Sequence, residues 1–345
     1  MLNLDYFYRE QLDYKEQETY DEIVRGAEAL DSRIRIPKKI STENIKKILE
    51  FVLYDNEEIF WVGRNFQVFE DETSKYLVLT YTHTIRQIER DKAEVSKELA
   101  KITKKYQQLG ITGELEALRF VHDYFLDNYS YDYKMREISH TILGVLATNG
   151  NRKAVCDGLS KAFRLVCRHL FGKTVAILIT GIARNPAKRL DIEAHAWLLV
   201  VIDGYTYWLD VTYNMTLSTK GLRRLDYFLI CSIELFQTHK PDYPMPECRI
   251  ENANFFRQRG LIANNMKALE ELINRHLEQD ILHFQVKLKD MVFTQILADE
   301  IMRLAQVCFE KKHNSSAAVH LSYNKAILVF EILYEKPKKR FSFWS

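Results

Sequence analysis

The chain has 345 residues, 47% of them apolar and 28% charged, an ordinary composition for a folded protein of two or three domains. A net charge of +2 argues against nucleic acid as the main partner, and no apolar run reaches membrane-spanning length, so we expect neither nucleic acid nor a membrane. The start MLNLDYFYRE lacks the features of a secretory signal, so we expect a cytoplasmic protein. The basic segment 336–340 is interpreted as a solvated end in preference to a phosphate contact.

The five cysteines are widely spaced, odd in number and without a CxxC pair. This pattern argues against a disulfide framework and against a structural zinc site. The histidines form no HExxH spacing, and no acidic ladder of a calcium loop occurs. We therefore expect reduced thiols and a protein without a metal or another cofactor.

The first third of the chain predicts a mixture of helices and strands. Helical spacing covers residues 14–30 and 42–54, and Thr42 is the cap candidate of the second helix. A short strand in RIRIP lies between them, and β-rich runs follow at 58–70 and 74–83. This region is therefore α+β.

A long charged helix is predicted at 85–109, with a narrow apolar stripe interrupted at Lys92. The preferred interpretation is that the stripe packs on the protein itself. The alternative is a partner helix bound along 85–109.

From Glu114 the pattern predicts a helix, then a second helix at 156–170 that Gly172 terminates. The stretch 193–214, EAHAWLLVVIDGYTYWLDVTYN, predicts two strands joined at Asp203-Gly204, a strong hairpin signal. The last hundred residues alternate between helices and strands and predict a small α+β domain. We therefore divide the chain into 1–113, 114–245 and 246–345.

Cys156 opens the helix at 156–170, in the sequence VCDGLSKAF. A helix N-terminus supplies partial positive charge and free N–H groups, which favour a thiolate and an oxyanion. We expect Gly158 to leave room for a substrate backbone. A lone cysteine at a helix start is more often a core residue, however, so the interpretation needs a partner.

The predicted hairpin supplies that partner. An even-numbered loop at Asp203-Gly204 sets Trp197 opposite Asp210, which puts Asp210 diagonal to His195 on one face. A three-residue loop would move Asp210 to the other face. A histidine among apolar residues is usually a satisfied core group, but a carboxylate in a strand interior needs a bound partner.

Three blocks resemble the transglutaminase-like superfamily: AVCDGLSKAFRLVCRHL, then EAHAWLLVVIDGYTYWLDVTYN, then DYFLICS. The upstream VHDYFLDNYSYDY is similar to the helix and turn that precede these blocks in the family, and the start of the chain resembles bacterial members with an extra N-terminal region. The resemblance covers residues 114–240.

The resemblance implies an α+β fold with a papain-like thiol core, in which a helix packs on an antiparallel sheet, flanked by small α+β domains. By position, it makes Cys156 the nucleophile, His195 the base and Asp210 the orienting carboxylate. The chain departs from the family at Leu198, where many members have asparagine. We expect the side chain of Leu198 to lie on the opposite face of the sheet from His195. Trp197 and Trp208 are expected to wall the cleft or fill the core, and the candidates for a second oxyanion donor are His140, Thr141 and Tyr131.

The sequence thus predicts a cysteine enzyme that acts on amide bonds of a protein or peptide substrate through a thioester. Its acyl acceptor, water or an amine, stays open. The alternative is a non-catalytic binding or scaffold protein that keeps the fold and uses the helix at 85–109 and the outer domains to hold partners.

Overall fold

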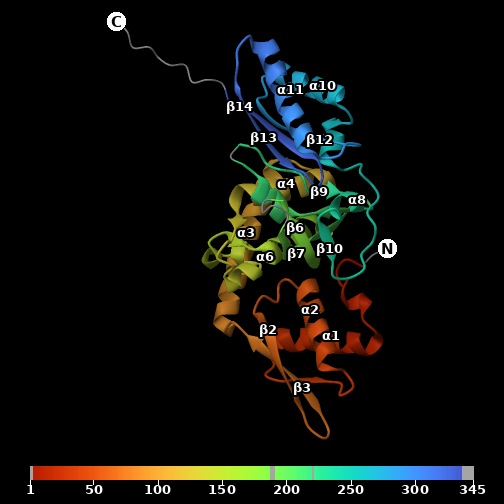
Figure 1. The fold of residues 1–345 in the computed structure, drawn as a ribbon. Coiled ribbons are helices and arrows are strands. Elements are labelled where there is room, and N and C mark those ends of the chain that lie inside the picture. Colours follow the sequence, from red (N-terminus) through yellow and green to blue (C-terminus); the bar gives the residue numbers. More distant parts are fainter. Residues whose placement is uncertain (1–2, 187–190, 220, 336–345) are drawn as a thin grey trace.

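The computed structural model describes residues 3–186, 191–219 and 221–335; the basic segment 336–340 lies outside them. Figure 1 shows three groups of elements along the long axis of the molecule: the N-terminal elements at one end, the central sheet with its helices in the middle, and the C-terminal elements at the other end. Each group combines helices with a mainly antiparallel sheet, so the predicted α+β class is confirmed. The domain boundaries stay a prediction.

The N-terminal group packs two helices and a short 3-10 turn beside a three-stranded sheet of order β1-β3-β2. The elements are η1 Arg9–Gln11, α1 Tyr14–Ala29, β1 Ile34–Ile36, α2 Thr42–Asp55, β2 Val62–Glu70 and β3 Lys75–Tyr81. The expected cap of α2 at Thr42 is wrong by one residue. Ser41 has the extended backbone that a cap requires, and its hydroxyl accepts a hydrogen bond from the N–H of Asn44 at 3.1 Å.

Helix α3, Ile85–Gln108, connects this group to the core, and Thr84 caps it in a capping box with Gln87. The middle of its apolar stripe, including Val95, Leu99 and Ile102, is buried in the main hydrophobic core, whereas Ile85 and Leu109 at the two ends are exposed. The stripe therefore packs against other elements of the same chain, in agreement with the preferred interpretation. A partner helix along 85–109 stays a prediction.

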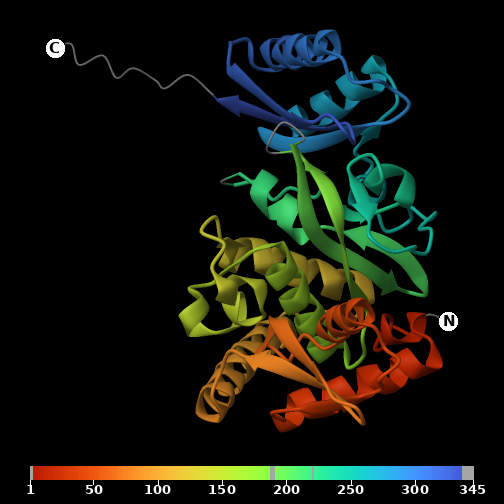
Figure 2. The ribbon, with the colours of Figure 1, turned by 60° about the horizontal axis from the view of Figure 1, so that its bottom comes forward.

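The middle group places helices against one five-stranded antiparallel sheet of order β10-β6-β7-β8-β9 (Figure 2). The helical elements are α4 Glu114–Asn128, η2 Glu137–His140, α5 Leu143–Leu146, η3 Thr148–Gly150, α6 Cys156–Phe171, α7 Val211–Leu217 and α8 Ser232–Leu235. The strands are β4 Ser130–Tyr131, β5 Lys153–Ala154, β6 Ala176–Asn185, β7 Asp191–Ile202, β8 Tyr205–Leu209, β9 Phe228–Ile230 and β10 His239–Pro241, where β4 and β5 form a separate pair. Helix α6 packs on β6 and β7, so the predicted core of a helix on an antiparallel sheet is confirmed.

The register of the β7–β8 hairpin is the predicted one. Leu198 pairs with Leu209 and Ile202 pairs with Tyr205, so the loop has two residues. Asp203 and Gly204 have φ of 50° and 79°, the left-handed backbone that a tight hairpin turn with the twist of the strands requires.

The second strand of this hairpin ends earlier than predicted. It stops at Leu209, and residues 211–217 form α7 instead of continuing the ladder to residue 214. Asp210 causes the change, because its carboxylate accepts the N–H of Tyr213 at 2.9 Å and so caps the new helix. The expected cross-strand pair of Trp197 with Asp210 does not form, because the ladder ends at the pair of Leu198 and Leu209.

The C-terminal group has its own hydrophobic cluster, between two helices and a four-stranded sheet of order β11-β12-β14-β13. Its elements are β11 Ile262–Ala263, α10 Met266–Glu278, β12 His283–Leu288, α11 Gln295–His313, β13 Ala318–Asn324 and β14 Val329–Glu335, after the short helix α9 Phe255–Gln258. Within the described ranges, none of the helices combines the length and apolarity needed to cross a bilayer.

Buried ion pairs fasten the C-terminal group to the core. The guanidinium of Arg224 donates to both oxygens of Asp226, at 2.7 Å each, and to Glu331 of β14 at 3.0 Å. The same glutamate accepts from Ser322 and from His283, at 2.6 and 2.7 Å. Since Arg224 and Asp226 are almost fully buried, removal of either side chain would leave the charge of the other buried without its partner.

Candidate functional site

Cys156 is the first residue of α6 and the one partly exposed thiol of the five free cysteines; the other four are buried. Val155 precedes it with an extended backbone and provides no side-chain cap. The N–H of Gly158 donates to Oδ1 of Asp157 at 3.0 Å, so the N–H groups of Cys156 and Asp157 are the donors that this positive helix end offers a ligand.

His195 lies on β7, opposite Gly181 of β6. Its Nε2 is 2.7 Å from Oδ2 of Asp210, which leaves Nδ1 for the Cys156 thiol. Tyr213 stacks on the imidazole, with ring centroids 4.3 Å apart and an interplanar angle of 19°. Burial by itself lowers the pKa of His195, but the charge and hydrogen bond of Asp210, with a hydrogen bond to Cys156, raise it to about 10. The imidazole therefore keeps its proton when it faces a thiolate.

Asp210 is fully buried at the junction of β8 and α7. Its Oδ1 accepts from the N–H of Tyr213, its Oδ2 accepts from His195, and its own N–H donates to the carbonyl of Tyr227 at 3.0 Å. Burial raises its pKa, but the adjacent imidazolium and the hydrogen bonds from His195 and His239 hold the pKa well below its usual range. Asp210 is thus an ionised carboxylate.

His239 of β10 is a fourth member of this cluster that sequence reasoning missed. Its Nε2 is 3.1 Å from Oδ2 of Asp210, and its Nδ1 is 2.8 Å from Oγ1 of Thr238. The ring is fully buried, and this burial lowers the pKa of His239. The local sequence contains no signal for this contact, because His239 lies in a connection without a clear helix or strand pattern. The one hint was that a buried carboxylate needs more than one donor.

Among the residues that the structure describes, two groups of side chains have donor atoms within 4.8 Å of one another and could hold a metal: His195, Asp210 and His239, and Cys231, Glu234 and Glu251. In the first group both imidazoles lie at hydrogen-bond distance from one carboxylate oxygen. Two N–H···O hydrogen bonds therefore account for the cluster without a metal. In the second, Glu251 pairs with Arg257 and with Lys289. The expectation of a metal-independent protein stays a prediction.

Asp157, next to the thiol residue, has two cationic partners and one imidazole partner from different parts of the chain. His140 Nδ1 lies 2.9 Å from Oδ1, and Arg64 of β2 lies 2.6 Å from Oδ2. Lys161 is 3.6 Å away. Burial raises the pKa of Asp157, but Lys161, His140 and Arg64 lower it below its usual range. The N-terminal group thus touches the first turn of α6.

Of the three candidates for a second oxyanion donor, two have other partners. His140 binds Asp157, and the hydroxyl of Thr141 donates to the carbonyl of Ile138 at 2.9 Å. Burial, together with the charges of Cys156, Glu193 and Asp157, raises the pKa of Tyr131, so its phenol keeps the proton that a donor needs. Tyr131 is therefore the candidate that we keep.

The expectation that Gly158 leaves room for substrate is wrong. A Cβ at this position would overlap the backbone carbonyl oxygen of Ser139. Gly158 therefore lets the first turn of α6 pack directly on the 3-10 turn η2, and that space is filled by the protein.

The two tryptophans and Leu198 are all fully buried. Trp208 donates its indole N–H to Ser232 at 2.9 Å. Trp197 is on the His195 face of the sheet, and its ring centroid is 4.8 Å from that of His239. Leu198, where the chain departs from the family, points into the core on the other face, as expected, and does not touch the cluster.

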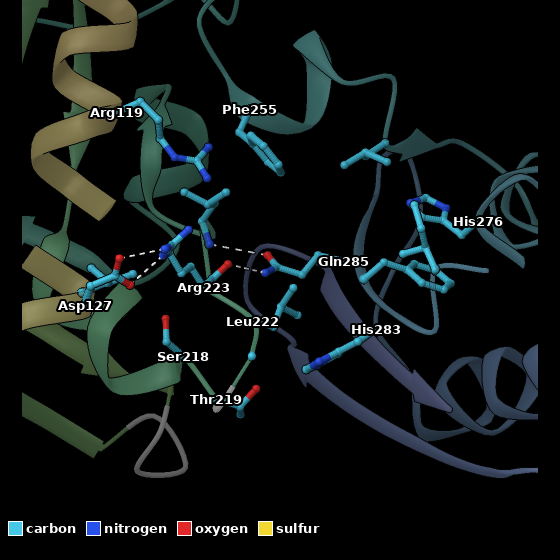
Figure 3. A pocket seen from close by; sticks show the side chains of 16 residues that line it. Arg119, Asp127, Ser218, Thr219, Leu222, Arg223, Phe255, His276, His283 and Gln285 are labelled. Carbon is cyan, nitrogen blue, oxygen red and sulfur yellow. Dashed lines mark hydrogen bonds and ion pairs between the residues drawn. The ribbon is translucent and has the colours of Figure 1, made fainter. Parts of the chain in front are cut away.

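A groove of about 510 Å³ lies between the core and the C-terminal group (Figure 3). Its polar side chains largely bind the protein itself: Arg223 pairs with Asp127 at 2.7 Å, and Gln285 donates to the carbonyl of Arg223 at 2.7 Å. Neither Cys156 nor the His195–Asp210–His239 cluster lines it. The groove is thus separate from the candidate site.

Comparisons with known proteins agree with the family resemblance that the central sequence blocks carry. Residues 102–212 match the family model described as the transglutaminase-like superfamily, so this segment is a transglutaminase-like domain. A search of the curated proteins found no match.

Two solved structures are similar to the chain at 14% identity. One is a TGase, with a TM-score of 0.28, 54% of this chain and 52% of that chain covered. The other is a proposed cysteine protease from Cytophaga hutchinsonii, with a TM-score of 0.25, 43% of this chain and 61% of that chain covered. The chain thus spans between half and two thirds of the length of either structure.

Proposed function

We propose that this chain, with its transglutaminase-like domain, is a cysteine-dependent acyl-transfer enzyme that acts on amide bonds of protein or peptide substrates. Cys156 is the nucleophile, His195 the acid and base, and Asp210 the orienting carboxylate. One observation supports the proposal: Nε2 of His195 is 2.7 Å from Oδ2 of the buried Asp210, and a hydrogen bond to Cys156 helps to raise the pKa of the same imidazole.

In the first step the Cys156 thiolate attacks the amide carbonyl carbon, and the carbonyl oxygen becomes an oxyanion. The N–H groups at the start of α6, with the phenol of Tyr131, are the donors available to it. The C–N bond then breaks, and the imidazolium of His195 gives its proton to the leaving amine. A thioester on Cys156 remains.

In the second step His195, now neutral, takes a proton from the acyl acceptor. Water gives an acid, and a primary amine gives a new amide; in both cases the C–S bond breaks and the thiolate returns. An assay with unfolded casein and a fluorescent alkylamine separates these outcomes. Incorporated label indicates transfer, new N-termini indicate proteolysis, and released ammonia without either indicates deamidation.

The first experiment is alkylation with limiting iodoacetamide at pH 6, with the label located by mass spectrometry. We expect Cys156 to react far faster than Cys167, Cys231, Cys248 and Cys308, since burial raises the pKa of each of these four thiols.

Exposure alone would also favour Cys156, so the control is His195→Ala, which leaves the thiol exposed but removes its imidazole. Loss of the preferential labelling in this variant supports the enzyme. Equal labelling of Cys156 with and without His195, or uniform slow labelling of all five thiols, contradicts it and favours a binding or scaffold protein.

A further inference from the structure

His239 is a buried ionisable residue that the proposed chemistry does not use. It lies on the edge strand β10, where it pairs with Ala183 of β6. Its imidazole is enclosed by rings: the centroids of Trp197, Tyr213 and Tyr227 lie 4.8, 5.2 and 5.4 Å from its own. A polar ring in this position needs a hydrogen-bond partner at each nitrogen.

Both nitrogens have one. Nε2 faces Oδ2 of Asp210 at 3.1 Å, and Nδ1 faces the hydroxyl of Thr238 at 2.8 Å. The Asp210 carboxylate is ionised and can only accept, so the proton must be on Nε2 of His239. Nδ1 then accepts from the hydroxyl of Thr238 at 2.8 Å, a proton that the hydroxyl shares with the more distant carbonyl oxygen of Leu235 at 3.3 Å. The ring is thus held as one neutral tautomer.

The groups that face His239 determine its protonation state. Burial and the neighbouring His195, whose ring centroid is 5.6 Å away, disfavour the protonated form of His239, whereas Asp210 favours it. The phenols of Tyr213 and Tyr227 stay neutral, because burial raises the pKa of each. When His195 is an imidazolium, a second positive charge on His239 would be repelled.

Oδ2 of Asp210 is therefore shared by two imidazoles with different roles. His195 is 2.7 Å from it and exchanges its proton during the reaction, whereas His239 is 3.1 Å from it and keeps its proton. Because Oδ1 is held by the N–H of Tyr213, His239 supplies the side-chain donor that holds the other oxygen while His195 changes charge.

We propose that His239 is a positioning residue of this site: a permanent neutral Nε2–H donor that orients Asp210 toward His195. The inference rests on the proposed function for its meaning in catalysis, but its hydrogen-bond geometry can be tested separately.

The first test is the alkylation rate of Cys156 against pH in the full-length wild type, His239→Leu and His239→Gln. Leucine removes the donor, whereas glutamine places an N–H₂ group near the position of Nε2. At pH 6 we expect the rate to fall about tenfold in His239→Leu, the size of one pKa unit, and to return to within about threefold of wild type in His239→Gln.

Near pH 10 an ordinary cysteine thiol is a thiolate without an imidazolium partner, so we expect all three rates to agree there. A merely structural role would instead change both variants alike or lower the rate at every pH. Either result, or a wild-type profile in His239→Leu, overturns the proposal.

A second test does not depend on thiol reactivity or on folding of the leucine variant. Side-chain ¹⁵N–¹H NMR of the wild type, assigned by the signal lost in His239→Gln, reports the tautomer of His239. We expect a neutral ring with the proton on Nε2 from pH 5 to 9. A protonated ring or an Nδ1–H tautomer contradicts the proposal.

The same spectra, recorded with ZnCl₂ and with EDTA, examine the metal alternative. A wild-type signal that shifts with zinc at one equivalent and reverts with EDTA would mean that His239 is a metal ligand, which also overturns the proposal. If His239 has the expected tautomer but Cys156 of the wild type is unreactive, the proposed enzyme function fails and the hydrogen-bond assignment stands.

Discussion

Asp210 is the residue on which the charge of the candidate site depends, because its buried carboxylate accepts from His195, His239 and the N–H of Tyr213. In Asp210→Asn the side chain keeps its size but has one acceptor oxygen and no charge. We expect the alkylation rate of Cys156 at pH 6 to fall at least about tenfold. The control is Asp203→Asn, the same change at the exposed hairpin turn, where asparagine tolerates the positive φ. Equal rates in the two variants would contradict this role.

The raised pKa of His195 also predicts how stability depends on pH. Because the folded pKa, about 10, exceeds the unfolded value near 6.5, the stabilisation is complete below pH 6.5 and is lost as the pH rises toward 10. Urea unfolding of the wild type and of His195→Gln at pH 6, 8 and 10 measures this stabilisation as a difference in the free energy of unfolding. The excess stability of the wild type should be largest at pH 6 and smallest at pH 10; a constant or growing excess would show that His195 is neutral when the protein is folded.

At the scale of elements, the first turn of α6 depends on close packing against the backbone of η2. The Cβ of Gly158→Ala would overlap the carbonyl oxygen of Ser139, which is backbone and cannot rotate away. We expect the free energy of unfolding to fall by about 1–3 kcal/mol. In the control Gly113→Ala, the Cβ meets the end of the flexible Glu116 side chain, and we expect a smaller loss by urea unfolding. A loss in Gly158→Ala no larger than in the control would contradict this reason for the glycine.

The hairpin that carries His195 was predictable because its determinants are local. Asp203-Gly204 allows a two-residue turn with positive φ, and that turn sets the whole β7–β8 register. The bounds of α6 were predictable for the same reason, since an apolar period of three and four residues ends at Gly172. The prediction that His195 and Asp210 share a face followed from the hairpin register alone.

The rest depended on contacts between distant parts of the chain. The residues after Asp210 include Val211 and Thr212, whose β-branching favours a strand, but the cap that Asp210 provides turns them into α7. His239 reaches Asp210 because three residues of β10 pair with β6, more than fifty residues earlier in the chain. No local pattern encodes that pairing.

At the scale of the whole molecule, Arg224 is the charge that joins the C-terminal group to the core. Arg224→Ala leaves Asp226 buried without its cation, so we expect a loss of about 3–5 kcal/mol in the free energy of unfolding. Limited proteolysis should then cut faster in the connection before β11. The control is Arg249→Ala, an exposed pair with Glu247 that should change stability by less than about 1 kcal/mol. Similar losses in both variants would mean that the buried pair does not join the two groups.

Cys156, His195 and His239 lie on α6, β7 and β10, Asp210 lies between β8 and α7, and His239 follows Cys156 by more than eighty residues. During synthesis on the ribosome the cysteine therefore emerges long before the strand that completes its surroundings. Under the proposed function, the site is complete only when β10 closes the edge of the sheet. Folding itself would then act as the switch that keeps the half-made protein from attacking neighbouring amide bonds.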